Sequence, residues 1–173
     1  MTQSLVLTVI GEDRPGLVEE LASVITRHQG NWLESAMSQL AGQFAGILRI
    51  SVPKAQTDAL QSALNGLSRL KVTVTAAAGE QGRTGRRFKL SLVGHDRIGI
   101  VREVSQVLAR HAVNVEELTT HTSSAPMSAE TLFHAQAELL AAEDLDTRAL
   151  TQALEQISND LMVDISLAET LRH

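Results

Sequence analysis

The chain has 173 residues, a formal net charge of −5 and no cysteine. Without cysteine it has no disulfides, thiolate nucleophiles or cysteine-ligated metals, and the acidic balance, with only three Phe and one Trp, argues against a nucleic-acid-binding surface. The N-terminus shows no signal-peptide pattern, and no apolar run reaches the roughly 18 residues that cross a bilayer, so we expect a soluble, cytoplasmic protein with no membrane contact.

The first half of the chain predicts the order strand, helix, strand, strand, helix, strand. Apolar runs with β-branched residues indicate strands, and apolar residues that recur every three or four positions indicate helices. A short turn at Ala41-Gly42-Gln43 joins the middle two strands as a hairpin. The expected strands cover 5–10, 31–40, 44–52 and 72–76, and the expected helices lie around 17–25 and 60–67.

The second half repeats this pattern. Leu5–Glu34 aligns without a gap with Phe88–Glu117, and from Gly11 to Gly94 the offset is 83 residues. The expected strands cover 88–92, 114–122, 131–140 and 163–167, and the helices lie around 100–108 and 150–161. Identical pairs in the aligned segments include Gly11/Gly94, Asp13/Asp96, Arg14/Arg97, Gly16/Gly99, His28/His111 and Asn31/Asn114.

The order β-α-β-β-α-β, found twice, predicts an α+β protein with two ferredoxin-like domains. Each would have a four-stranded antiparallel sheet with both helices on one face. The expected domains are 1–79 and 88–173, joined by a linker over 80–87. Glycines and the basic cluster Arg83, Arg86, Arg87 and Lys89 favour a flexible, solvated linker, and the alternative is contact with an anionic partner. Because units of about 80 residues bury only a small core, we expect them to pack on each other or on a second chain.

The two turns carry a family resemblance. GEDRPGLV and GHDRIGIV each lie between a strand and a helix, and an Asn follows fifteen residues after the second Gly, at Asn31 and Asn114. This pattern resembles the ACT domain, a small-molecule-binding regulatory module, although the second copy has Ile98 where Pro is usual. A chain that consists of two such repeats is similar to the glycine cleavage system transcriptional repressor family. The resemblance implies a non-enzymatic regulator without a cofactor that senses an amino acid, with glycine as first candidate, and acts on a transcriptional activator.

The turn has suitable groups for a free amino acid. Unsatisfied backbone N–H groups at the helix start can receive a carboxylate, and Asp13 can accept from the ammonium. Asn31, at the start of the adjacent or partner-domain strand, offers a donor and an acceptor. The resemblance implies effector contacts for Asp13, Asn31, Asp96 and Asn114. The expected ligand-binding set is Asp13, Arg14, Pro15, Gly16, Asn31, Asp96, Arg97, Gly99 and Asn114.

Purely structural roles are open for the same residues. Asp13 and Asp96 are placed to cap the following helix, and Pro15 suits its first turn. Gly16 and Gly99 would then serve close helix-on-strand packing, and the two asparagines the turn into the second strand. Arg14 and Arg97 are expected to be solvated or ion-paired.

Other residues give weaker signals. His28 and His111 fall in the last turn of each first helix, where an imidazole complements the helix dipole. His121 and His134 could be cross-strand neighbours, but no third ligand accompanies them, so we expect no metal site. Trp32 is expected to pack at the core or an interface.

Two functions compete at this point. The first is the amino-acid sensor, acting through a protein partner without direct nucleic acid contact and assembled by homodimerisation or intramolecular domain pairing. The second is an effector-free module that only binds other proteins. Since no phosphate loop, nucleophile elbow or paired-carboxylate motif occurs, we expect no enzyme activity.

Overall fold

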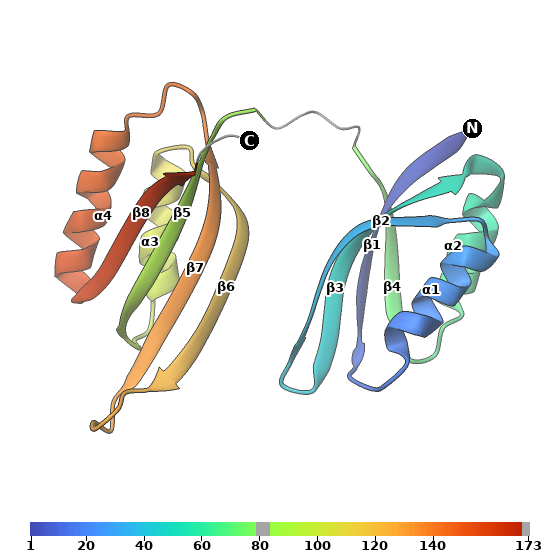
Figure 1. Ribbon diagram of the computed structural model, residues 1–173, viewed down its shortest axis with the longest axis horizontal. Coiled ribbons are helices and arrows are strands. Elements are labelled where there is room, and N and C mark those ends of the chain that lie inside the picture. The colour runs from blue at the N-terminus through green and yellow to red at the C-terminus, as the bar shows by residue number, and fades with distance from the viewer. Residues whose placement is uncertain (79–83, 171–173) are drawn as a thin grey trace. The chain divides into compact units, whose positions relative to one another are not determined.

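The computed structural model describes residues 1–78 and 84–170. The chain divides into two compact units, Met1–Gln81 and Gly82–His173, and each has the element order β-α-β-β-α-β. This confirms the predicted fold class of two ferredoxin-like units (Figure 1). No helix in the described ranges is both long enough and apolar enough to cross a membrane.

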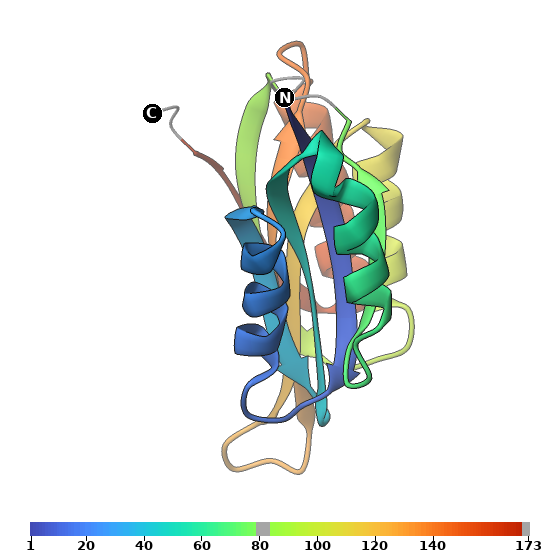
Figure 2. The same cartoon turned by 90° about the vertical axis from the view of Figure 1, so that its right-hand side faces the viewer.

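The first unit is a four-stranded antiparallel sheet in the order β2-β3-β1-β4, with β1 and β3 in the middle. Figure 2 shows α1 and α2 side by side on this sheet. A single 3-10 turn, Lys54–Gln56, precedes α2. The elements are β1 (Thr2–Glu12), α1 (Leu17–Arg27), β2 (Asn31–Leu40), β3 (Gln43–Pro53), α2 (Thr57–Asn65) and β4 (Lys71–Ala76).

The second unit repeats this topology in the order β6-β7-β5-β8. Its edge strand β6 is exposed along nearly its whole length. The elements are β5 (Arg86–His95), α3 (Ile100–Arg110), β6 (Asn114–Ser124), β7 (Thr131–Ala141), α4 (Thr147–Leu161) and β8 (Val163–Thr170).

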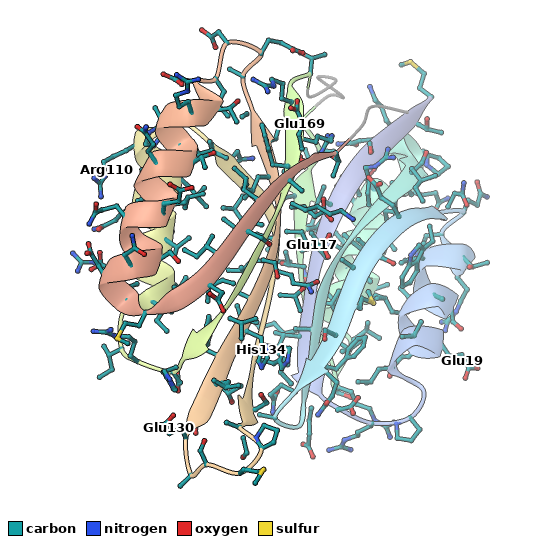
Figure 3. All side chains as sticks on the ribbon, turned by 60° about the vertical axis from the view of Figure 1, so that its left-hand side comes forward. Glu19, Arg110, Glu117, Glu130, His134 and Glu169 are labelled. Atoms are coloured by element: carbon teal, nitrogen blue, oxygen red, sulfur yellow. The ribbon has the colours of Figure 1, made fainter. Side chains whose placement is uncertain are left out.

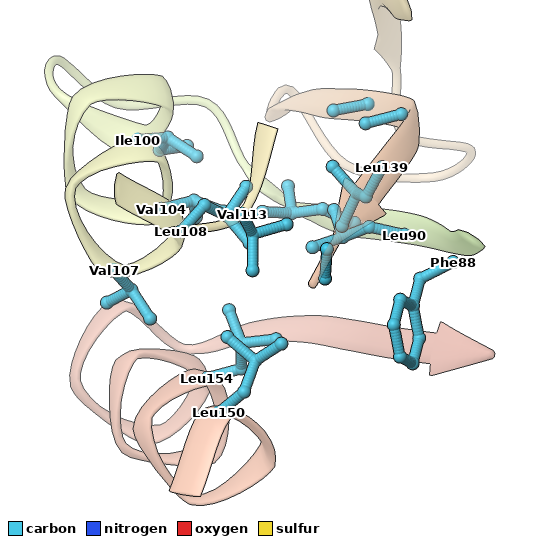
Figure 4. Close-up of a cluster of buried hydrophobic side chains, with 14 of the residues drawn as sticks. Phe88, Leu90, Ile100, Val104, Val107, Leu108, Val113, Leu139, Leu150 and Leu154 are labelled. Atoms are coloured by element: carbon cyan, nitrogen blue, oxygen red, sulfur yellow. The ribbon is translucent and has the colours of Figure 1, made fainter. Parts of the chain in front are cut away.

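Each core lies between the sheet and its two helices. In β1, Leu5, Leu7 and Val9 alternate with more exposed residues, so that one side of the strand is buried under the helices. The counterparts in β5 are Phe88, Leu90 and Leu92, which meet the apolar faces of α3 and α4 (Figure 4). The opposite face of each sheet carries no helix of its own unit, and we call it the open face.

The expected linker differs from the structure at its C-terminal end. Residues 80–83 lie outside the described residues, but Arg86 and Arg87 already belong to β5, where they pair with Ala141 and Leu140 of β7. The apolar alternation in the sequence predicts a strand only from Phe88 onward. Arg86 and Arg87 are polar and do not continue this alternation, although their backbones pair in the sheet.

The basic cluster is neutralised in the second unit. Arg86 makes two 2.9 Å hydrogen bonds to Glu169, Arg87 pairs with Glu116, and Lys89 Nζ lies 3.7 Å from the Glu138 carboxylate. These residues therefore make strand-to-strand ion pairs instead of forming a solvated linker. Arg83 lies outside the described part of the chain.

Candidate functional site

The turn between β1 and α1 leaves backbone donors open at the helix start. Helix α1 begins at Leu17, its N-cap is Gly16, and no side chain caps it. The first helical hydrogen bond runs from the Glu20 N–H to the Gly16 carbonyl (2.9 Å), so the N–H groups before Glu20 have no partner within the helix. The second unit has the same start, with Gly99 as N-cap and a 2.9 Å bond from Glu103 N–H to Gly99 O.

Asp13 and Asp96 do not cap these helices, so that prediction is wrong. Each lies three residues before the N-cap glycine, and its backbone N–H ties the turn to the neighbouring hairpin, at Gly42 O and Thr131 O respectively (both 2.9 Å). Both side chains are exposed. Within the described ranges neither carboxylate has a hydrogen bond or ion pair, so both are available to a ligand.

Pro15 also lies before the helix and not in its first turn as predicted. It precedes the N-cap Gly16, which adopts φ = 90°. Its counterpart Ile98 is fully exposed in the same position. The repeated feature of the turn is therefore the left-handed glycine, and the residue before it varies.

Two different needs explain the repeated glycines. Gly16 and Gly99 have φ values of 90° and 94°, which disfavour other residues, and a side chain there would point into open space. Close packing, the predicted reason, is therefore wrong for this pair. It does hold for Gly11 and Gly94, where an added Cβ would collide with the Arg69 carbonyl and with Val163.

The two arginines of the turns are engaged locally. Arg14 Nη2 lies 3.2 Å from Glu12 Oε2 in an exposed ion pair, as predicted. Arg97 Nη1 lies 3.4 Å from the carbonyl oxygen of Leu161, at the C-terminal end of α4, where a cation complements the helix dipole.

Asn31 and Asn114 lie at the other end of each sheet. Asn31 pairs with Ser51, and Ser51 with Ser4 of β1, whereas the Asp13 turn follows Glu12. Asn31 is therefore level with Ser4 of β1, eight strand residues before Glu12, which corresponds to about 27 Å. The second unit has the same arrangement, because Asn114 connects through Leu140 to Arg87 and the turn follows His95. One unit therefore does not bring its aspartate and asparagine to the same ligand, and adjacency within a unit is ruled out.

The remaining predicted residues have structural partners. His28 and His111 lie at the C-terminal ends of α1 and α3, as predicted, with Nδ1 2.9 Å from the carbonyl oxygens of Val24 and Val107. Trp32 packs against the first core and donates to Ser35 Oγ (3.1 Å).

The comparisons with known proteins agree with this architecture. The family model of the ACT domain matches residues 3–76, which include nearly all of the first β-α-β-β-α-β unit. An unknown protein from Galdieria sulphuraria is 32% identical, with a TM-score of 0.85 over 99% of this chain and 100% of that one. The chain belongs to the ACT-domain family.

The second unit lies outside the residues that the family model matches, and it has the same fold as the first. A proposed glycine cleavage system transcriptional repressor matches with a TM-score of 0.72 and 19% identity over 99% of both chains, a likeness that concerns the fold. No curated protein matches the chain. Both units carry the same strand-turn-helix corner, with a left-handed glycine N-cap and an exposed aspartate.

Proposed function

We propose that this ACT protein is a non-enzymatic regulator that senses an amino acid, with glycine as the first candidate effector, and modulates a transcriptional activator by binding it. The proposal rests on two features that occur together in each turn. The N–H groups at the helix start have no cap, and the aspartate of the same turn has no partner in the described part of the chain.

The chemistry of these groups matches a zwitterion. The effector carboxylate would accept from the N–H groups at the start of α1 or α3, favoured by the helix dipole. The effector ammonium would donate to Asp13 or Asp96. Gly16 and Gly99 leave the approach to the backbone open because no side chain covers it. In this proposal Arg14, Pro15 and Arg97 border the site, and their backbone sets its shape.

We also propose effector contacts for Asn31 and Asn114, but not with an effector held by the turn of their own unit. Because each lies about 27 Å from the turn of its own unit, it would contact an effector held by the turn of a different ACT unit. Replacing Asn31 should then weaken effector binding without altering the Asp13 turn.

A panel of amino acids tests the sensor. Effector at a hundredfold excess over its Kd stabilises the folded protein by about 2.7 kcal/mol, which a thermal melt detects readily. We expect glycine or a small polar amino acid to raise the melting temperature and to release or absorb heat in calorimetry. A panel that gives neither response would eliminate the sensor.

The regulatory half of the proposal requires coupling. An effector can change the affinity for a protein partner only as far as it prefers one state of the regulator over another. The net charge of −5 supports action through a protein contact, since a DNA-binding surface needs basic groups. The affinity for a candidate activator, measured with and without effector, should differ, and equal affinities would contradict regulation by the effector.

An effector-free interaction module is the second candidate, and the open face of the first ACT unit favours it. This face exposes Ile10, Ile47 and Leu40, with relative residue exposures of 49%, 55% and 73%, on three adjacent strands. Exposed apolar surface of this kind commonly marks a protein contact. Partner binding that is indifferent to every amino acid would select this module over the sensor.

A further inference from the structure

A pair of histidines stands out on the open face of the second unit. His121 of β6 and His134 of β7 are directly opposite in the ladder, which confirms that they are cross-strand neighbours. Their rings are stacked, with centroids 4.5 Å apart and planes inclined by 1°. Figure 3 shows His134 on the sheet, whereas Arg110 belongs to the helical side.

The fold does not require these histidines. The ladders align the two repeats, so that His121 corresponds to Ser38 and His134 to Ala45 in the first unit. The same sheet therefore forms with a hydroxyl and a methyl group at these positions. The two imidazole groups are therefore present only in the second repeat, and the sheet does not need them to form.

The surroundings of the pair suit a cation. Ser123 Oγ lies 2.7 Å from His134 Nε2, which leaves Nδ1 of that ring for another partner. Asp164 of β8 lies on the same face, two strands from His134 across Val93. Glu117 and Glu138 face each other further along β6 and β7, with one cation, Lys89, near Glu138. Asp164 thus lies at the level of the imidazoles, and Glu117 and Glu138 lie four strand positions away.

The spacing of the rings is compatible with one metal ion. Two imidazole nitrogens on the same ion, each at about 2.0–2.1 Å from it, lie roughly 3–4 Å apart. In the stack the nitrogen lone pairs lie in two nearly parallel planes and do not converge, so binding one ion requires both rings to turn well out of the stack about Cβ–Cγ, a broad torsion in histidine. Among residues 1–78 and 84–170 no group of three or more His, Asp or Glu side chains gathers to hold a metal, so the ion would keep solvent ligands.

We propose that His121 and His134 bind one transition-metal dication of the Cu²⁺, Ni²⁺ or Zn²⁺ class, each through one imidazole nitrogen, with water completing the coordination shell. Imidazole prefers these ions over Mg²⁺ or Ca²⁺, and the Irving–Williams order makes Cu²⁺ the tightest of the three. The histidine pair shares no residue with the proposed effector turns.

Calorimetric titration of the full chain, without a histidine tag, tests the site. CuCl₂, ZnCl₂ and MgCl₂ are added in turn in a non-coordinating buffer. The double variant His121→Ser/His134→Ala installs the residues of the first unit and should therefore fold, which its melting curve checks. His95→Gln is the matched control, since His95 lies on the same face but pairs with Glu130 (3.1 Å).

We expect one Cu²⁺ per chain, weaker Zn²⁺ binding and no response to Mg²⁺. The folded double variant should bind Cu²⁺ at least about tenfold more weakly, and His95→Gln should stay within about twofold of the wild type. The proposal is overturned if the wild type binds no Cu²⁺, if the double variant retains full affinity, or if His95→Gln loses as much as the double variant.

Discussion

Replacing Asp96 by alanine should cost the second unit almost nothing in stability, in contrast to the same replacement at Asp146. Asp146 is the N-cap of α4, and its Oδ1 accepts a 3.0 Å hydrogen bond from the Ala149 N–H. Losing such a cap costs about 1 kcal/mol, or a melting temperature lower by about 4–8 °C in a unit of this size. Asp96 caps nothing and is exposed, so its replacement should stay within about 0.5 kcal/mol of the wild type.

Both variants lie in the same unit and remove the same side chain, so each controls for the other. Urea unfolding followed by far-UV circular dichroism reports both units, and the fluorescence of the only tryptophan, Trp32, reports the first. The dichroism transition should shift to lower urea for Asp146→Ala alone. If Asp96→Ala destabilised the protein as much as Asp146→Ala, the aspartate of the turn would be a structural cap and its proposed role in effector binding would lose its basis.

The glycines and one ion pair give further predictions. Gly16→Ala should cost about 1–2 kcal/mol from its positive φ alone, and Gly11→Ala should cost more because its Cβ would strike the Arg69 carbonyl; equal losses in urea unfolding would contradict this division. The Arg86 guanidinium, through its hydrogen bonds, holds the pKa of Glu169 below its ordinary value of 4.5. A carboxylate with a lowered pKa stabilises the fold above the pKa of its unfolded state and loses this effect as the pH falls through the folded value. Glu169→Gln should therefore lower the melting temperature at pH 7, and the difference should disappear as the pH falls through the folded pKa of Glu169. A pH-independent difference would argue against an electrostatic origin.

The fold was predictable because its elements depend on local patterns that occur twice. Alternation at Leu5, Leu7 and Val9 marks a strand with one buried side, and the spacing of Leu17 and Leu21 marks a helix. Because the two repeats align without a gap, each strand or helix predicted in one half also predicts its counterpart in the other half. The polar ends of the strands were missed, because Thr2 and Arg86 enter the sheets through backbone pairing that side-chain periodicity does not reveal.

The candidate site was only half predictable. Motif spacing places Asp13 before a helix, but whether it caps that helix depends on where the left-handed residue falls, and this is Gly16. Spacing also brings Asn31 near Asp13 in sequence, whereas the parallel directions of β1 and β2 place it at the far end of the sheet. The reason for Gly11 is a contact with Arg69, which is distant in sequence and shows no local signal.

The most direct test of the sensor is a calorimetric titration of three proteins with glycine and serine: the wild type, Asp13→Ala/Asp96→Ala, and Asp146→Ala. We predict binding to the wild type and to Asp146→Ala with similar affinity. The double variant of the turns should fold like the wild type but bind at least about tenfold more weakly, since a hydrogen bond to a charged group contributes about 1.5–3 kcal/mol. Undiminished binding by the double variant would contradict the assignment of the effector to these turns.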